Sequence, residues 1–225
     1  MSRNSKMFMV DGRRVKTWNP VVGCLHDCIY CYARRWARRQ KKRCLSCYVF
    51  SPHLHEERLS KVPRSRLPIF VCDMADLFGD WVPKEWITAV LKVLQEHHDQ
   101  TFLLLTKNPR RYFEFLDLIG DNVVLGATIE SDLYHPYISK APPTCDRIRW
   151  MSKLPARFRR FVSIEPVMDF TDEFAECIKR INPEFVYIGY DNYNNNLPEP
   201  PIEKVIQLIE ELKEFTEVRV KTLKK

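Results

Sequence analysis

NPVVGCLHDCIYCYAR, residues 19–34, is the most informative stretch of this chain. Its cysteines Cys24, Cys28 and Cys31 follow the spacing C-x3-C-x2-C, so one short loop can place three thiolates around a single soft metal centre. A [4Fe–4S] cube bound by three cysteines keeps one iron free for another ligand. A structural zinc site normally closes with four ligands, and His26 inside the loop could be the fourth. The loop therefore predicts an iron–sulfur cluster, with zinc as the alternative.

Composition restricts the class of protein. A chain of 225 residues can bury a substantial core without disulfide bonds. Eight cysteines are too few for a disulfide scaffold of this size, and a reducing compartment suits them. Residues 1–16 are polar and basic, unlike a signal peptide, and no run approaches the ~20 apolar residues of a membrane span. We therefore expect a cytoplasmic protein with no membrane partner.

The net charge of +7 is unevenly distributed. Residues 1–66 carry 16 Lys/Arg and 4 Asp/Glu, a net charge of +12, whereas residues 67–225 carry a net charge of −5. The basic excess therefore belongs to the segment around the cysteine loop. Such asymmetry favours a polyanionic partner, and the simpler interpretation is a solvated basic surface.

Downstream of residue 66, short apolar runs alternate with amphipathic runs. The expected strands are Pro68–Cys72, Thr101–Thr106, Val123–Thr128, Phe161–Glu165, Phe185–Gly189 and Glu217–Lys221. Their near-continuous apolar character is typical of strands covered on both faces. The expected helices are Lys84–His98, Pro109–Ile119, Glu173–Ile181 and Ile202–Phe215.

This alternation predicts a parallel sheet with right-handed crossovers. With a further strand near the cysteine loop, the expected fold is α/β, a partial (β/α)6 barrel of the TIM-barrel type. Residues 1–225 are expected to form one such domain, with a basic, cysteine-containing N-terminal segment over about residues 1–66.

The cysteine loop resembles that of the radical S-adenosylmethionine (radical SAM) superfamily, whose signature has an aromatic residue before the last cysteine, here Tyr30. The wider loop is similar to spore photoproduct lyase-like proteins. FVCDMADLF (residues 70–78) and VSIEP (residues 162–166) resemble an uncharacterised, phage-type radical-SAM-like family. Together these likenesses cover about residues 10–225.

The resemblance implies an enzyme. Cys24, Cys28 and Cys31 would hold a [4Fe–4S] cluster that binds S-adenosylmethionine. An electron from a donor such as ferredoxin or flavodoxin would cleave it to a 5′-deoxyadenosyl radical, which abstracts hydrogen from a substrate. The protein would supply orientation and a dry cavity.

Candidate cofactor-binding residues lie at the expected carboxyl ends of the strands, where ligands bind in parallel α/β folds. The Gly-Gly-Glu motif that often contacts the methionine amino group in this superfamily is missing, so Asp73 is assigned that role by position alone. An Asp, Ser or Thr at such a junction could equally cap a helix. The full set of candidates is Tyr30, Asp73, Thr128, Glu130, Ser163 and Glu165.

A second candidate metal site is the C-x2-C pair Cys44 and Cys47, which is followed by His53 and His55. This spacing could bind zinc or an auxiliary cluster. The alternative is two ordinary cysteines in a reducing cell. Neither Cys145 nor Cys177 lies in a motif that gives it a role, and the helical spacing of Cys177 places it in the core.

Two groups of basic residues stand out, and basic residues with interleaved aromatic residues suit phosphate contact with base stacking. The first, residues 34–43, follows the loop directly. The second comprises Arg147, Arg149, Lys153, Arg157, Arg159 and Arg160 around Trp150 and Phe158. A nucleic acid is therefore a candidate substrate. The competing interpretation is a non-catalytic zinc- or Fe–S-binding module that binds nucleic acid or senses redox state.

Overall fold

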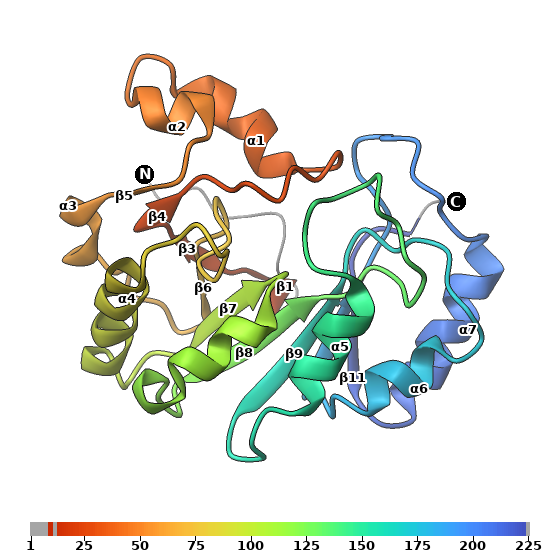
Figure 1. Ribbon diagram of the computed structural model, residues 1–225. Helices are drawn as coiled ribbons and strands as arrows, with labels where there is room; N and C mark the ends of the chain where they lie inside the picture. Colours follow the sequence, from red (N-terminus) through yellow and green to blue (C-terminus); the bar gives the residue numbers. More distant parts are fainter. Residues whose placement is uncertain (1–8, 11–12, 224–225) are drawn as a thin grey trace.

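The computed structural model describes residues 9–10 and 13–223; most of the polar N-terminal stretch that argued against a signal peptide lies outside them. Its centre is a curled parallel sheet of seven strands in the order β11-β10-β9-β8-β7-β6-β3 (Figure 1). The bounds are β3 (Lys16–Trp18), β6 (Ile69–Val71), β7 (Phe102–Thr106), β8 (Val123–Thr128), β9 (Arg159–Ile164), β10 (Phe185–Ile188) and β11 (Glu217–Val220). This half-barrel confirms the predicted α/β class.

All six predicted strands are present, with ends that differ by at most two residues. Strand β8 has the predicted bounds, and β9 begins at Arg159, two residues earlier than expected. The seventh strand, β3, lies beside β6 and leads into the cysteine loop, as expected for a strand near that loop.

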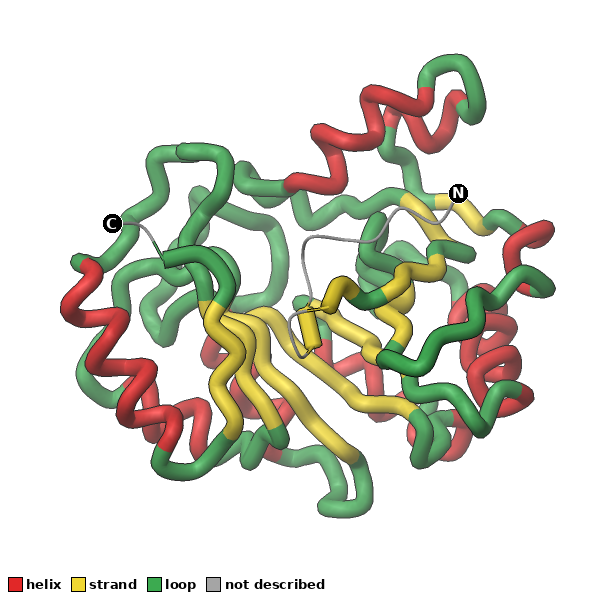
Figure 2. Tube along the Cα trace, turned by 180° about the vertical axis from the view of Figure 1, so that it is seen from behind, coloured by secondary structure: helices red, strands yellow, loops and turns green. Residues whose placement is uncertain are grey.

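Helices cover one face of the sheet (Figures 1 and 2). They are α4 (Lys84–Glu96), α5 (Thr144–Ser152), α6 (Phe174–Lys179) and α7 (Ile202–Lys213). Helix α5 was not predicted, because its nine residues present only a short apolar stripe. The predicted α-helix Pro109–Ile119 was wrong: the segment forms 3₁₀ turns, η2 (Pro109–Glu114) and η3 (Leu116–Leu118).

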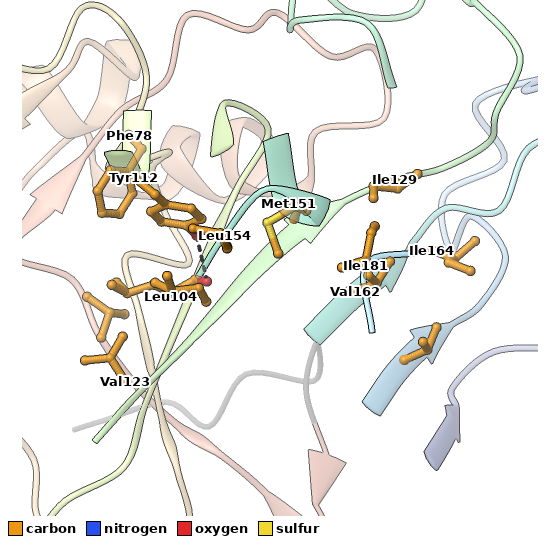
Figure 3. Packing of buried hydrophobic residues seen from close by; sticks show 14 of the residues in the cluster. Phe78, Leu104, Tyr112, Val123, Ile129, Met151, Leu154, Val162, Ile164 and Ile181 are labelled. Carbon is orange, nitrogen blue, oxygen red and sulfur yellow. Dashed lines mark hydrogen bonds between the residues drawn. The ribbon is translucent and has the colours of Figure 1, made fainter. Parts of the chain in front are cut away.

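Tertiary contacts explain this error. The hydroxyl of buried Tyr112 donates to the carbonyl oxygens of Leu104 at 3.1 Å and Gly126 at 2.8 Å, which fixes the segment against β7 and β8. Figure 3 shows Tyr112 packed against Phe78 and close to Leu104 within the core beneath the helices. The hydrogen bonds and burial of Tyr112 require the tighter 3₁₀ path, and they stabilise the segment more than its intrinsic preference for an α-helix would.

Alternate residues of each strand face opposite sides of the sheet. Outward residues such as Ile69, Leu104 and Val162 join the main core under the helices. Inward residues form a second, smaller core at the amino-terminal half of the barrel interior: Val15, Phe70, Leu103, Val124, Phe161, Phe185 and Tyr187. Strands covered on both faces account for the near-continuous apolar runs in the sequence.

The N-terminal segment builds a lobe that lies at the carboxyl-terminal end of the strands (Figure 1). It contains α1 (Tyr32–Ala37), the 3₁₀ turn η1 (Arg38–Gln40), α2 (Leu45–Val49) and α3 (Glu56–Leu59). The antiparallel pair β4 (Val21–Val22) with β5 (His53–Leu54) completes the lobe. A second antiparallel pair, β1 (Met9–Val10) with β2 (Arg13–Arg14), lies outside it, and Val10 packs against the second core. Among the described residues, no helix is long and apolar enough to span a bilayer.

Candidate functional site

The inner face of the sheet changes from apolar to polar toward the carboxyl ends of the strands. Residues that continue the inward alternation there are Lys107 after β7, Thr128 at the end of β8, Ser163 in β9, Glu165 after it and Lys221 after β11. All five line a cavity of about 1030 Å³. The barrel interior is therefore closed by packed side chains at one end and forms a polar site at the other.

The cysteine loop forms another wall of this cavity. Cys24, Cys28 and Cys31 all line it, together with Tyr30 from the same loop. A cavity of this size accommodates a small-molecule ligand or cofactor. The structure therefore brings the three predicted metal ligands to the carboxyl end of the strands, where parallel α/β folds bind their ligands.

Gly23 sets the path of the loop. Its φ is +98°, and a Cβ atom there would lie 2.3 Å from the carbonyl oxygen of Ser51. Its amide donates to the carbonyl oxygen of Met74 at 2.9 Å, which ties the loop to the segment after β6. Only glycine combines this backbone conformation with such close contact.

The other side of the loop is attached to the segment after β8. The amide of Ile29 donates to the carbonyl oxygen of Ile138 at 3.0 Å, and the amide of Lys140 donates to the carbonyl oxygen of His26 at 2.7 Å. The Cys28 sulfur lies 3.1 Å from the hydroxyl oxygen of Ser139. The cysteines are thus held between two strand-end loops.

The Nε2 atom of His26 contacts a carboxylate. That nitrogen lies 2.8 Å from Oδ2 of Asp76, and both side chains are buried. Asp76 also accepts from the hydroxyl of Thr106 at 2.6 Å and the amide of Lys107 at 2.8 Å. Burial alone would raise the pKa of Asp76, but these donors hold it below its ordinary value. Asp76 therefore anchors the loop through His26, a role that the sequence did not reveal.

Glu130 differs from the other candidates because it does not line the cavity. Its buried carboxylate lies 2.8 Å from Arg147 Nη1 and 3.2 Å from Lys107 Nζ, and it accepts from the hydroxyl of Tyr30. Burial would raise the pKa of Glu130, but Arg147 and Lys107 lower it to about 2. Glu130 is a fixed anion that positions Tyr30 and Lys107 from behind.

Asp73 lies on the cavity wall, where Asn19 holds it. The amide nitrogen of Asn19 donates to Oδ1 of Asp73, and its amide oxygen accepts from the backbone of Met74 at 3.0 Å. The hydroxyl of Tyr32 donates to the backbone carbonyl of Asp73. Burial raises the pKa of Asp73 to about 6 despite the hydrogen bond from Asn19. A partly buried carboxylate of this kind is suited to receive a cationic group.

Glu165 and Lys221 form a partly buried ion pair that also lines the cavity. Lys221 Nζ lies 2.8 Å from Oε1 of Glu165, and the hydroxyl of Ser163 donates to Oε2 at 3.3 Å. Burial raises the pKa of Glu165 and lowers that of Lys221, while each charge opposes the shift of the other. A charged group of a ligand could replace one member of this ion pair and bind the other, an anion at Lys221 or a cation at Glu165.

Five of the six predicted cofactor-binding residues thus line one cavity: Tyr30, Asp73, Thr128, Ser163 and Glu165. The set of candidates predicted from the sequence does not include Asn19, Asp76, Lys107 or Lys221. Counting alternate residues inward along β7 and β11 would have indicated the two lysines. Cys145 is exposed, and Cys177 packs at the edge of the core as expected.

The second cysteine pair lies in the N-terminal lobe. Cys44 and Cys47 come together with His53 and His55, and the four ligand atoms all lie within 4.8 Å of one another. Among the described residues, these four side chains form the one compact group of His, Cys, Asp or Glu whose ligand atoms could hold a single metal ion. The loop cysteines are not part of such a compact group.

The two groups of basic residues differ in how far their side chains are exposed and paired. In the first, six side chains are exposed: Arg35, Arg38, Arg39, Lys41, Lys42 and Arg43. In the second, Arg147 pairs with Glu130, Arg159 pairs with Glu184, and buried Arg160 donates to backbone carbonyls. These three are engaged within the protein, whereas Arg149, Lys153 and Arg157 are exposed beside Trp150 and Phe158. A nucleic-acid surface at the second group therefore stays a prediction.

Comparison with solved structures identifies similar folds. A variant of spore photoproduct lyase gives a TM-score of 0.59 at 9% identity over 91% of this chain. A second variant, with bound AdoMet and a dinucleoside spore photoproduct, gives 0.59 at 8% identity, and a complex of the lyase with the dinucleoside spore photoproduct gives 0.57 at 9% identity, each over 91% of this chain. This chain covers 62% of each of those structures. These likenesses show a radical SAM-like fold.

Comparison with sequences gives a family. No curated protein matches the chain. A family model matches residues 13–181, which include β2 to β9, the cysteine loop and the second cysteine pair. The chain therefore belongs to the family described as "Protein of unknown function (DUF5131)".

Proposed function

We propose that this protein is a radical SAM enzyme. The observation that carries the proposal is the position of Cys24, Cys28 and Cys31, which line one cavity together with the polar carboxyl ends of the parallel strands. Three thiolates suit a [4Fe–4S] cluster, and the remaining cavity wall suits a polar cofactor. The likeness to spore photoproduct lyase structures supports this assignment at the level of the fold.

The cysteine loop favours a cluster over zinc. A single zinc ion at the loop would need a fourth ligand close to the three sulfurs. The ligand atoms of the loop cysteines are absent from the compact single-ion group found among the described residues. A cube, by contrast, takes its cysteine ligands at separate corners.

With the cluster reduced, the chemistry supplied would be cleavage of S-adenosylmethionine to a 5′-deoxyadenosyl radical. The chain's own residues would bind and orient S-adenosylmethionine. We assign Asp73, with its carboxylate held by Asn19, to the cationic amino group. Thr128 and Ser163 offer hydroxyls on the opposing wall, and Lys107 offers a cation near the aromatic ring of Tyr30 at 5.4 Å.

Binding of S-adenosylmethionine distinguishes the enzyme from a non-catalytic metal module. A ligand that binds only the folded state raises the free energy of unfolding, by about 2.7 kcal/mol when its concentration is 100 times Kd. The melting temperature rises with it. We expect S-adenosylmethionine to stabilise the anaerobically reconstituted protein and Asp73→Asn to weaken that effect, with Asp117→Asn as the control on η3. An unchanged melting temperature with a filled cluster would favour the module.

We further propose that the substrate is a nucleic acid. The exposed basic side chains of residues 35–43 flank the cavity, whose lining includes Trp36, Gln40 and Arg43 from the same lobe. The guanidinium of Arg39 lies 4.0 Å from the ring of Trp36, which joins charge to a stacking surface. A dinucleoside spore photoproduct is bound in two of the three spore photoproduct lyase structures compared above.

Salt dependence tests this substrate class. Binding through phosphate contacts weakens steeply with salt, with a slope of about −0.7 per contact for single strands. Exchanging Arg38 and Arg39 for glutamine should therefore weaken binding to a single-stranded oligonucleotide and lower the slope by about one to two. The control is Lys153→Gln with Arg157→Gln in the second basic group. Equal losses in both variants would contradict a nucleic-acid site on this lobe.

A further inference from the structure

The N-terminal lobe carries a cluster of side chains that the proposed chemistry does not use. Cys44 precedes α2 and Cys47 lies within it, while His53 and His55 come from β5 and the residue that follows it. The thiols are free of disulfide bonds. From this geometry we propose that the four side chains form a structural zinc site, Cys2His2, separate from the cysteine loop.

Distances between the ligand atoms support one shared ion. The Nε2 atom of His53 lies 3.6 Å from the sulfur of Cys44 and 3.4 Å from that of Cys47, and Nε2 of His55 lies 3.2 Å from the sulfur of Cys47. Zn–S bonds near 2.3 Å and Zn–N bonds near 2.0 Å imply tetrahedral edges of about 3.3–3.8 Å. These three distances are close to such edges, and all four ligand atoms lie within 4.8 Å of one another.

The outer contacts of both histidines orient their lone pairs inward. Nδ1 of His53 lies 2.8 Å from the carbonyl oxygen of Ser51, so it must donate a proton there. Nδ1 of His55 lies 3.0 Å from Oε1 of Glu57. A neutral imidazole that donates from Nδ1 presents an unprotonated Nε2. Hydrogen bonds of this kind normally support zinc-binding histidines.

The two inward nitrogens then face each other. Nε2 of His53 and Nε2 of His55 lie 2.9 Å apart, at hydrogen-bond distance although both are acceptors in this state. Two lone pairs at this distance repel unless a proton or a metal cation lies between them. A divalent cation bound also by two thiolates satisfies both nitrogens, and mixed sulfur and nitrogen ligands in a tetrahedron favour zinc.

An auxiliary iron–sulfur cluster fits less well. In a two-iron cluster with two cysteines and two histidines, the pairs bind different irons. Here the nitrogen of His53 is within 3.6 Å of both sulfurs, which indicates one centre. The thiols and imidazoles are interleaved and not separated into pairs.

The position of this site suggests what the zinc ion stabilises. Strand β5 pairs with β4, with Leu54 opposite Val21 and His53 opposite Val22, and β4 leads directly into the cysteine loop. The same β5 segment is joined by the ion to α2, which packs against η1 and α1. Zinc would therefore tie the basic lobe to the base of the cysteine loop.

Metal content tests the proposal independently of any radical chemistry. The chain would be produced at full length with Cys24, Cys28 and Cys31 all changed to alanine, so that no cluster forms at the loop. Elemental analysis should still find about one zinc ion per chain. Adding Cys47→Ser or His55→Ala should lower zinc by about tenfold or more, whereas the controls Cys145→Ser and His98→Ala should retain it.

A second variant covers the case in which zinc loss unfolds the chain. His55→Cys supplies a different zinc ligand, so this variant should fold and retain zinc, and its cobalt form should absorb as a site with three sulfurs. Zinc that persists after Cys47→Ser would overturn the proposal. So would iron that depends on Cys47, or a Cys44–Cys47 disulfide recovered from a chain without zinc.

Discussion

At the residue scale, the site depends on charges that are fixed before any cofactor binds. Glu130 is the clearest example, because it is buried, ionised and in contact with Arg147, Lys107 and Tyr30. The sequence placed Glu130 at the end of a strand and suggested contact with the cofactor. The structure instead places it behind the cavity wall, where it orients the two residues that do line the cavity.

Removing this charge should be costly. Glu130→Gln leaves buried Arg147 and partly buried Lys107 beside a neutral group. Breaking a buried ion pair destabilises a protein by about 3–5 kcal/mol. We expect that loss in urea unfolding at pH 7. The control is Glu210→Gln, whose exposed pair with Lys213 should contribute less than about 1 kcal/mol. Equal effects of the two substitutions would contradict this role.

The pH dependence of stability follows from the same residue. The pKa of Glu130 in the folded protein is about 2, below its ordinary 4.5, so its ionisation stabilises the fold above pH 4.5. This contribution should disappear as the pH falls from 4.5 toward 2. Stability of the wild-type protein should therefore fall more steeply over that range than stability of Glu130→Gln. Parallel pH profiles of the two proteins would show that Glu130 is not so strongly paired.

At the scale of elements, the loop that carries the cysteines is shaped by close backbone contacts. Gly23 has a φ of +98°, and the backbone of Ser51 and Pro52 leaves no room for a side chain. The loop therefore cannot be moved independently of the segment between α2 and β5. This contact links the cysteine loop to the lobe that holds the second group of ligands.

Gly23→Ala should destabilise the fold measurably. Forcing an L-residue into this conformation costs about 1–3 kcal/mol, and the clash with the Ser51 carbonyl adds to it. Thermal or urea unfolding measures the loss. Gly120→Ala is the comparison, since Gly120 has no positive φ and a Cβ atom there would meet the Asn122 side chain at 2.9 Å and no backbone atom. Equal stability of the two variants would argue against a constrained loop.

Regular elements were predictable from sequence where burial decides the pattern. The strands were found because both sheet faces are apolar over most of their length, and α4 and α7 were found because each has a long apolar stripe. Segment 109–119 was mistaken for an α-helix because the hydrogen bonds of Tyr112 to two strands are invisible to local propensity. Contacts of this kind join residues that are distant in the chain.

The candidate site was predictable to a similar degree. The spacing of Cys24, Cys28 and Cys31 and the strand ends with Asp73, Ser163 and Glu165 were sufficient to anticipate a common cavity. Residues that act through a partner were missed, because Asp76 reaches the loop only through His26. Whether Cys44 and Cys47 share a metal ion with His53 and His55 was left open. The β4–β5 contact that places the two histidines beside the cysteine loop joins residues about 30 positions apart, and local sequence patterns do not reveal it.

At the scale of the whole molecule, the chain separates stability from chemistry. The amino-terminal half of the barrel interior is packed with apolar side chains, and the carboxyl-terminal half forms the polar cavity. Substitutions that alter the cavity wall should therefore affect function before they affect folding. This arrangement is typical of (β/α) barrels, where loops carry function and the interior supplies stability.

The most direct test of the central claim is cleavage of S-adenosylmethionine. The protein would be reconstituted anaerobically with iron and sulfide and reduced with dithionite, and 5′-deoxyadenosine would be measured by chromatography. We expect the product from the wild-type chain and from the control Cys145→Ser, and none above background from Cys24→Ala, Cys28→Ala or Cys31→Ala. A wild-type chain that binds only zinc, or that binds a cluster without forming 5′-deoxyadenosine, would contradict the claim.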